Sequence, residues 1–212
     1  NVMDVSRLEN RAVPKALDED DPEAVHNLLD VYNSLSLKNM QECYNDAIYY
    51  RDQIRQLFRL GQCSLRHRAV SDTIFWAVIR SIAEKLPEMK NPPSALRDVD
   101  LALASIYYCN MSVFQSLPDA WAISHLFPIM PLHRLDEMPT EQAILADITC
   151  DSDGKLDNFI DIHGVKRVLE LHTLNHCEPY YLGAFLVGAY QETLGDLHNL
   201  FGDTNVVSVR IN

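Results

Sequence analysis

The sequence predicts an α+β protein in which an antiparallel helical bundle is followed by a mainly β domain of sandwich or barrel type. The spacing of apolar residues is near 3.6 up to about residue 105 and close to 2 beyond it. The seven glycines are also unevenly placed, since only Gly61 precedes Gly154 and the other six lie between Gly154 and Gly202. These patterns divide the chain into a linker at 1–19, a helical bundle at 20–105 and a C-terminal β-domain at 106–212.

Four helices are expected in the bundle. The acidic residues and the proline at 20–23 are typical of a helix start. A second helix follows from Leu37 and ends at Gly61, which is well placed as a C-terminal cap. A third covers about 64–86, and a fourth begins near Ala95 after a connector rich in proline.

The second part contains short segments that alternate apolar and polar residues or are rich in β-branched residues. Asp153-Gly154 and His163-Gly164 supply turns between some of them. The strands are expected at 107–114, 143–149, 165–171, 180–186 and 206–211.

Composition excludes several classes of function. Thirty acidic against 18 basic side chains give a net charge of −12, the wrong sign for binding nucleic acid or an anionic membrane. No apolar run approaches the roughly 20 residues of a membrane helix.

The five cysteines form no CxxC pair, which favours neither disulfides nor zinc and fits a reducing cytoplasm. The strand-like end at 205–212 and the missing initiator Met indicate a segment of a longer polypeptide.

Charged stripes and histidines give weak signals. Arg51, Arg55 and Arg59 recur at four-residue spacing, which suits a phosphate-binding stripe but is more typical of a solvated helix face. The eight histidines show no HxH or HExxH spacing, so the sequence specifies no metal site.

The densest polar cluster is 149–157 (TCDSDGKLD). A calcium loop is excluded because Thr149 and Ile160 occupy positions that require carboxylates. A hairpin with its turn at 152–155 is one interpretation. The other is a chemical site, since a thiol at Cys150 can deliver a proton and a carboxylate at Asp151 can hold a cation.

A second cluster spans 178–191 (EPYYLGAFLVGAYQ). Gly183 and Gly188 allow another backbone or a flat ligand to approach closely, and Tyr190 offers a hydroxyl to such a ligand. Tight packing in a sandwich core explains the same residues equally well.

Four motifs together resemble the biosynthetic arginine decarboxylases, in the order that family shows. The resemblance covers most of the chain, with 20–105 similar to the family's helical bundle and the remainder similar to its C-terminal β-domain. The (β/α)8 barrel with the cofactor-anchoring lysine, the glycine-rich phosphate loop and a C-terminal helical tail are absent. The motifs are 112–121 (SVFQSLPDAW), 147–154 (DITCDSDG), 188–192 (GAYQE) and 197–203 (LHNLFGD).

The resemblance implies a pyridoxal 5′-phosphate enzyme that converts arginine to agmatine and carbon dioxide for polyamine synthesis, with Mg²⁺ as an accessory metal. It also implies a site formed between two subunits of a homodimer or larger oligomer. Cys150 matches the acid that protonates the substrate Cα after decarboxylation. Asp151 matches the partner of the substrate guanidinium. Tyr190 matches a tyrosine that contacts the cofactor phosphate.

Two positions differ from the related ornithine enzymes. Those enzymes have Asn-Asp-Gly where this chain has Asn-Met-Ser at 110–112, so one acidic substrate ligand is missing. They have Phe-Asn where this chain has His198-Asn199; Asn199 matches, and His198 is kept as a candidate pocket residue.

The sequence therefore predicts that the chain supplies half of an active site and is inactive alone. The alternative is a non-catalytic homologue that pairs with an active decarboxylase subunit and regulates it.

Overall fold

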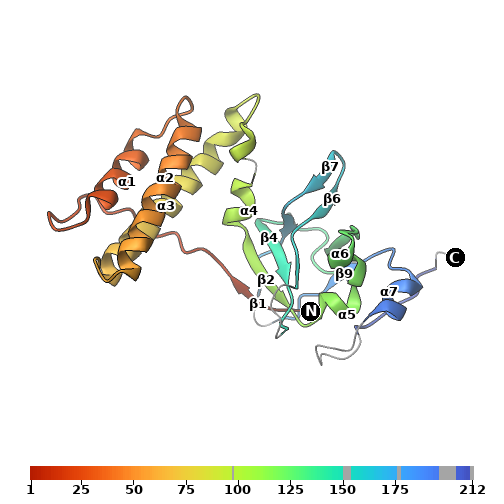
Figure 1. Cartoon of the computed structure of the whole chain (residues 1–212). Helices are drawn as coiled ribbons and strands as arrows, with labels where there is room; N and C mark the ends of the chain where they lie inside the picture. Colours follow the sequence, from red (N-terminus) through yellow and green to blue (C-terminus); the bar gives the residue numbers. More distant parts are fainter. Residues whose placement is uncertain (97, 150–153, 176–177, 196–203, 211–212) are drawn as a thin grey trace. The chain divides into compact units, whose positions relative to one another are not determined.

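The computed structural model describes residues 1–96, 98–149, 154–175, 178–195 and 204–210. It contains two compact units, one formed by 9–103 and the other by 1–8 together with 104–212 (Figure 1). The first unit is helical and the second is built on a mixed sheet, so the predicted α+β class is confirmed. The expected linker at 1–19 differs at its start, because β1 (Val2–Ser6) is a strand of the second unit.

The helical unit follows the local signals of its sequence. Helix α1 starts directly after Pro22, whose fixed φ suits the first turn. Gly61 ends α2 with a φ of 72°, and its N–H donates to the Phe58 carbonyl oxygen at 3.0 Å. The Ser64 side chain caps α3 by accepting from the His67 N–H. The elements are α1 (Glu23–Ser34), α2 (Met40–Arg59), α3 (Leu65–Lys85), the 3-10 turns η1 (Leu86–Glu88) and η2 (Ser94–Leu96), and the short α4 (Val99–Leu103).

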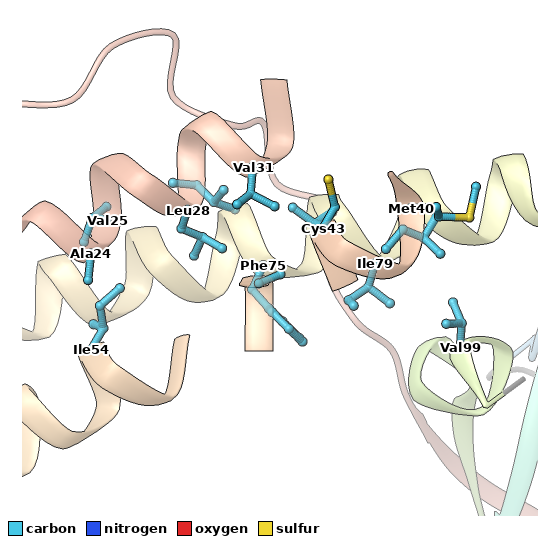
Figure 2. Packing of buried hydrophobic residues seen from close by; sticks show 14 of the residues in the cluster. Ala24, Val25, Leu28, Val31, Met40, Cys43, Ile54, Phe75, Ile79 and Val99 are labelled. Carbon is cyan, nitrogen blue, oxygen red and sulfur yellow. The ribbon is translucent and has the colours of Figure 1, made fainter. Parts of the chain in front are cut away.

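The core of this unit is formed by the apolar faces of the three long helices (Figure 2). Leu28 of α1, Ile54 of α2 and Ile74 of α3 are completely buried. Each such side chain contributes about 1.5–3 kcal/mol by leaving water. The helical spacing of the sequence therefore identifies the faces that pack.

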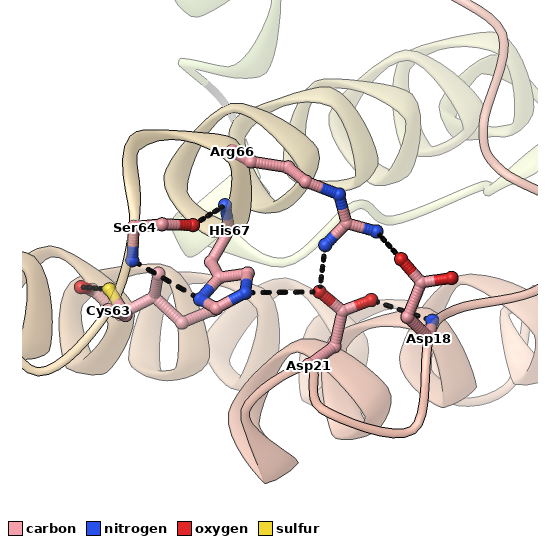
Figure 3. Close-up of polar contacts among 7 residues, drawn as sticks. Asp18, Asp21, Cys63, Ser64, Arg66 and His67 are labelled. Atoms are coloured by element: carbon pink, nitrogen blue, oxygen red, sulfur yellow. Dashed lines mark hydrogen bonds and ion pairs between the residues drawn. The ribbon is translucent and has the colours of Figure 1, made fainter.

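A buried carboxylate joins the approach to α1 with the start of α3 (Figure 3). The side chain of Asp21 is fully buried and accepts hydrogen bonds from the Arg66 Nη1 at 2.6 Å and the Asp18 N–H at 2.9 Å. Arg66 also pairs with Asp18, and His67 Nε2 lies 3.6 Å from Asp21. This charged cluster fixes the N-terminal ends of two helices that are far apart in sequence.

The arginine stripe differs from a simple solvated face. The guanidinium of Arg51 lies 3.8 Å from the centre of the Phe75 ring, and its side chain is only 17% exposed. Burial, and then the nearby charge of Arg55, lower the pKa of Arg51. Arg55 instead pairs with Asp72 of α3. These two side chains thus help to hold α2 against α3.

The second unit is organised around strand β4. Its strand order is β1-β2-β4-β5, with β8 also paired to β4; β2 and β4 are parallel and the other pairs are antiparallel. The strands β3 and β9 form a separate pair, and so do β6 and β7. Their bounds are β2 (Ser105–Cys109), β3 (Ile129–Pro131), β4 (Glu141–Ala146), β5 (Lys155–Leu156), β6 (Phe159–Asp161), β7 (Gly164–Lys166), β8 (Leu169–Leu171) and β9 (Leu182–Ala184).

Three short helices interrupt the expected run of strands. They are α5 (Val113–Ser116), α6 (Pro118–Ala122) and α7 (Ala189–Leu194), and all three contact one another. The strand expected at 107–114 therefore ends at Cys109. The predicted turn at His163-Gly164 does join β6 to β7, and β5 pairs with β4 as the hairpin interpretation requires. Residues 206–210 have no regular secondary structure, in contrast to the predicted strand.

The core of this unit contains a buried hydrogen-bond network. The Tyr107 hydroxyl donates to the His172 carbonyl oxygen at 3.0 Å. The Tyr180 hydroxyl accepts from the His172 N–H and lies 2.7 Å from Nδ1. His172 Nε2 faces the Glu137 carbonyl oxygen at 3.1 Å, which requires a proton on that nitrogen. The network ties β2 to the segments that follow β8.

Candidate functional site

The first part of the candidate site is the connection from β4 to β5, whose base is held by Asp147. This carboxylate is 7% exposed and accepts hydrogen bonds from the Val113 N–H at 3.0 Å and the Thr149 hydroxyl at 2.9 Å. The N–H of Asp147 donates to the Gly154 carbonyl oxygen at 2.8 Å. Both ends of the connection are therefore bonded through one residue.

Gly154 is required by this arrangement. A Cβ atom at this position would overlap the carboxylate of Asp147, so no larger residue fits without displacing it. Cys150 and Asp151 lie between these two ends and outside the described residues.

The second part is the α5–α6 segment, which begins at the partner of Asp147. Ser112 caps α5 by accepting from the Gln115 N–H at 3.2 Å, and Asp147 accepts from the Val113 N–H at the start of the same turn. The rings of Phe114 and Trp121 pack edge to face at 5.2 Å, which joins the two short helices.

The third part is α7, which carries Tyr190. Gln191 is buried, and its Oε1 accepts from the Asp119 N–H at 3.1 Å while its Nε2 donates to the Asp119 carboxylate. Gly195 passes so close to the Gln115 carbonyl oxygen that a Cβ atom would overlap it. Tyr190, the residue before Gln191, is 78% exposed.

The hydrogen bonds of Asp147 and Gln191 thus connect three of the four sequence motifs. Motif 147–154 is joined to motif 112–121 through Val113, and motif 188–192 is joined to it through Asp119. Of the four predicted site residues, the structure places only Tyr190. Cys150, Asp151 and His198 lie outside the described residues, as does Asn199.

Two residues with a role in this arrangement were not identified from the sequence. Asp147 and Gln191 both stand inside the quoted motifs, and that is the available signal. What they bind lies 34 and 72 positions away, respectively, so no local pattern indicates the contact.

The fit of this surface to a cofactor rests on Tyr190. Its hydroxyl is exposed at the start of α7 and is able to donate to a phosphate oxygen. Lys155 and Lys166 of the same unit pair with Asp157 and Glu170. The described residues therefore offer a contact to a cofactor and do not enclose one.

Metal sites and cavities give a different picture. Over the described ranges, no three His, Cys, Asp or Glu side chains are grouped to hold a metal ion. A cavity of about 210 Å³ lies beside β3 and β6, where Phe159, Ile160 and Lys166 line it together with Pro128, Ile129, Met130 and Leu169. None of these belongs to the four motifs. In the part of the chain that is described, no helix has the length and apolar character to cross a membrane.

The architecture defines a helical bundle attached to a mixed-sheet domain, and comparison identifies the class of the bundle. Residues 18–100 match the family model of the arginine decarboxylase helical bundle domain. The chain is 51% identical over 211 residues to the biosynthetic arginine decarboxylase of Thermosynechococcus vestitus, covering 100% of this chain and 33% of that protein. Identity to the enzyme of Phocaeicola vulgatus is 47% over 210 residues, covering 96% and 33%.

A solved structure agrees with these relatives. The crystal structure of the biosynthetic arginine decarboxylase from Campylobacter jejuni superposes with a TM-score of 0.72 and 35% identity, over 95% of this chain and 32% of that one. Residues 18–100 therefore form the helical bundle domain of the arginine decarboxylases, and the chain as a whole is similar to the biosynthetic arginine decarboxylases. It spans about a third of the length of the curated relatives it matches.

Proposed function

We propose that this chain contributes one part of the active site of an arginine decarboxylase that converts L-arginine to agmatine and carbon dioxide for polyamine synthesis. The observation that supports the proposal is the pair of hydrogen-bonded joints made by Asp147 and Gln191. They hold three family motifs in one unit, although the motifs are separated by up to 70 or so residues along the chain. Such preorganisation is what a catalytic site requires.

Each candidate residue has a role in this proposal. Cys150 donates the proton that Cα needs after carbon dioxide leaves. Asp151 binds the guanidinium of arginine through paired hydrogen bonds. Tyr190 contacts the phosphate of pyridoxal 5′-phosphate, which supplies the electron sink for decarboxylation when it is bound. His198 forms part of the substrate pocket.

The proposed site is completed by other parts of the enzyme. In the proposal, the anchoring lysine lies outside this chain, and a second subunit of the same enzyme provides the opposite wall. Exposed apolar side chains on α6 and α7 suit burial against such a surface. They are Trp121 of α6 and Tyr190 and Leu194 of α7, and Ile123 and Leu186 beside these helices are exposed as well. The chain alone is then inactive, and it should not retain pyridoxal phosphate through gel filtration.

Two further expectations, on a metal and on the cellular compartment, come from the resemblance to the arginine decarboxylases. Mg²⁺ is implied by resemblance, but the described side chains offer no grouped ligands for it, so no step is assigned to the metal. The thiols of Cys43, Cys63 and Cys109 are free, which suits a reducing cytoplasm as the site of action.

The test uses the full-length parent enzyme with Cys150→Ala. Loss of the proton donor should leave carbon dioxide release in place and lower the agmatine formed per carbon dioxide. The matched control is Cys109→Ala, which removes a buried thiol at the end of β2 and should leave that ratio at one. A ratio of one in Cys150→Ala would refute the role of Cys150.

A further inference from the structure

We infer that Gln191 is a positioning residue for Tyr190, a role that rests on the proposed function. The two residues are neighbours on α7, and successive side chains of a helix point about 100° apart. Gln191 is buried and bonded to α6, whereas Tyr190 is 78% exposed. The direction of the hydroxyl that is proposed to contact the cofactor phosphate is therefore set by the buried side chain next to it.

Helix α7 depends on its neighbours for its orientation. It has six residues, and isolated helices shorter than about 12 residues are marginal in water. Its contacts are with α5 and α6. At its C-terminal end the Gly195 N–H donates to the Gln191 carbonyl oxygen at 3.0 Å, and Gly195 lies against the Gln115 carbonyl oxygen. At its other end the side chain of Gln191 makes the connection.

The amide of Gln191 uses both of its polar atoms on one residue of α6. Oε1 accepts from the Asp119 N–H at 3.1 Å, which is a first-turn N–H without a partner inside its own helix. Nε2 donates to the Asp119 carboxylate. Two bonds from one planar group fix the angle between the helices as well as their distance. A carboxylate at position 191 would accept from the N–H but would repel the carboxylate of Asp119.

A contact to a phosphate is sensitive to this angle. A binding group has to stay within about 0.5 Å of its productive position, and packing has to hold it there. Tyr190 is mostly exposed, so the backbone of α7 has to provide that support. Loss of the Gln191–Asp119 joint should therefore weaken the binding of pyridoxal 5′-phosphate. The binding of pyridoxal, which has no phosphate, should not change.

The experiment titrates the full-length apoenzyme with pyridoxal 5′-phosphate and with pyridoxal and follows the protein fluorescence. Tyr190→Phe should raise the Kd of the phosphorylated compound about tenfold or more, because a hydrogen bond to a charged group is lost. Gln191→Ala should raise it about three- to tenfold, since the hydroxyl is displaced rather than removed. Asp119→Ala loses one bond of the joint and should have a smaller effect in the same direction. Asp119→Asn keeps an acceptor for Nε2 and should stay within about twofold of wild type.

A double-mutant cycle tests whether Gln191 acts through Tyr190. In the Tyr190→Phe background, Gln191→Ala should change the Kd by less than about twofold, because no hydroxyl is left to be positioned. The stability control is Tyr180→Phe, which removes a buried hydroxyl beside His172 in the same unit. It should lower the melting temperature and leave both dissociation constants unchanged.

The outcomes distinguish the inference from the proposed function. Equal weakening of both compounds by Gln191→Ala, or the same effect in the Tyr190→Phe background, would show a merely structural role and overturn the inference. Normal binding in Gln191→Ala and Asp119→Ala, with weakened binding in Tyr190→Phe, would overturn the inference alone. Normal binding in Tyr190→Phe would overturn the proposed role of Tyr190 as well. If Gln191→Ala does not fold, Asp119→Ala makes the same comparisons.

Discussion

Replacement of Asp21 by alanine should destabilise the helical bundle more than the loss of an exposed carboxylate would. The carboxylate is fully buried although its partner Arg66 has a side chain that is 49% exposed. It accepts one charge-assisted hydrogen bond from Arg66 and one from the Asp18 N–H (Figure 3). Both bonds disappear in Asp21→Ala, and the packing of α1 against α3 loses its fixed end.

The magnitude follows from these two bonds. A hydrogen bond to a charged group contributes about 1.5–3 kcal/mol and a backbone one about 1 kcal/mol. Arg66 and Asp18 can regain water because both are partly exposed, which offsets part of the loss. The expected decrease in the free energy of unfolding is therefore about 2–3 kcal/mol. With a urea m-value of about 1.5 kcal/mol/M, the midpoint should fall by about 1.3–2 M.

The dependence on pH gives the same carboxylate a second signature. Burial alone would raise the pKa of Asp21, but the hydrogen bonds from Arg66 and from the Asp18 N–H outweigh it and hold the pKa below its usual range. A lowered folded-state pKa gives stability that is present above the unfolded value and lost as pH falls below it. Asp21→Asn should therefore flatten the acid limb of the stability curve.

Urea titrations of the whole chain, followed by far-ultraviolet circular dichroism, report on the long helices. Asp20→Ala is the matched control, because Asp20 is the exposed neighbour and its loss changes the net charge equally. A double-mutant cycle with Arg66→Ala should give a coupling energy of about 1–3 kcal/mol. Equal midpoints for Asp21→Ala and Asp20→Ala would refute the structural role of the buried carboxylate.

Two further outcomes are expected. Burial raises the pKa of Cys109 to about 11 and that of Tyr107 to about 12, so the folded state keeps these protons at higher pH than the unfolded chain does. The free energy of unfolding should stay constant below about pH 9 and then fall by about 1.4 kcal/mol per pH unit as each group titrates. Cys109→Ala should remove the part of that fall that begins at the lower pH. An unchanged curve in this variant would contradict the prediction. The guanidinium of Arg51 covers the Phe75 ring, and the thioether of Arg51→Met should cover it in its place, so the free energy of unfolding should stay within about 0.5 kcal/mol of wild type. Arg51→Ala should lower that free energy by about 1–2 kcal/mol. Equal losses in both variants would show that the charge, not the packing, holds α2 to α3.

The helical unit could be predicted from sequence because its signals are local. Pro22, Gly61 and Ser64 mark helix ends through their own backbone or side-chain chemistry, within a few residues of the positions they affect. The apolar spacing then identifies the buried faces. Contacts between helices add stability to elements that the chain already specifies.

The short helices of the second unit could not be predicted in this way. Helix α5 has only four residues, too few for a periodic pattern, and one of its N–H groups is bound by a carboxylate 34 positions later. At 206–210 the opposite occurs: an alternating sequence predicts a strand, but the described residues provide it with no ladder partner. Tertiary contacts decide both cases.

The candidate site was predicted only in part, for the same physical reason. Its chemically active side chains are recognisable from motifs, whereas the residues that hold the motifs together depend on partners elsewhere in the chain. Asp147 reads locally as one more acid in a polar segment. Its role becomes visible only when the N–H of Val113 and the backbone of Gly154 are seen to meet at its carboxylate.

The glycine asymmetry of the sequence has a structural cause in these same joints. Long helices pack through side chains, so the bundle needs a glycine only at the positive φ of Gly61. The second unit joins short segments by direct approach of backbone to carboxylate or carbonyl. Gly154 lies against Asp147 and Gly195 against the carbonyl of Gln115, each at a contact between motif-bearing segments. Adding a methyl group at either position should therefore disturb the relative placement of the motifs before it disturbs the sheet.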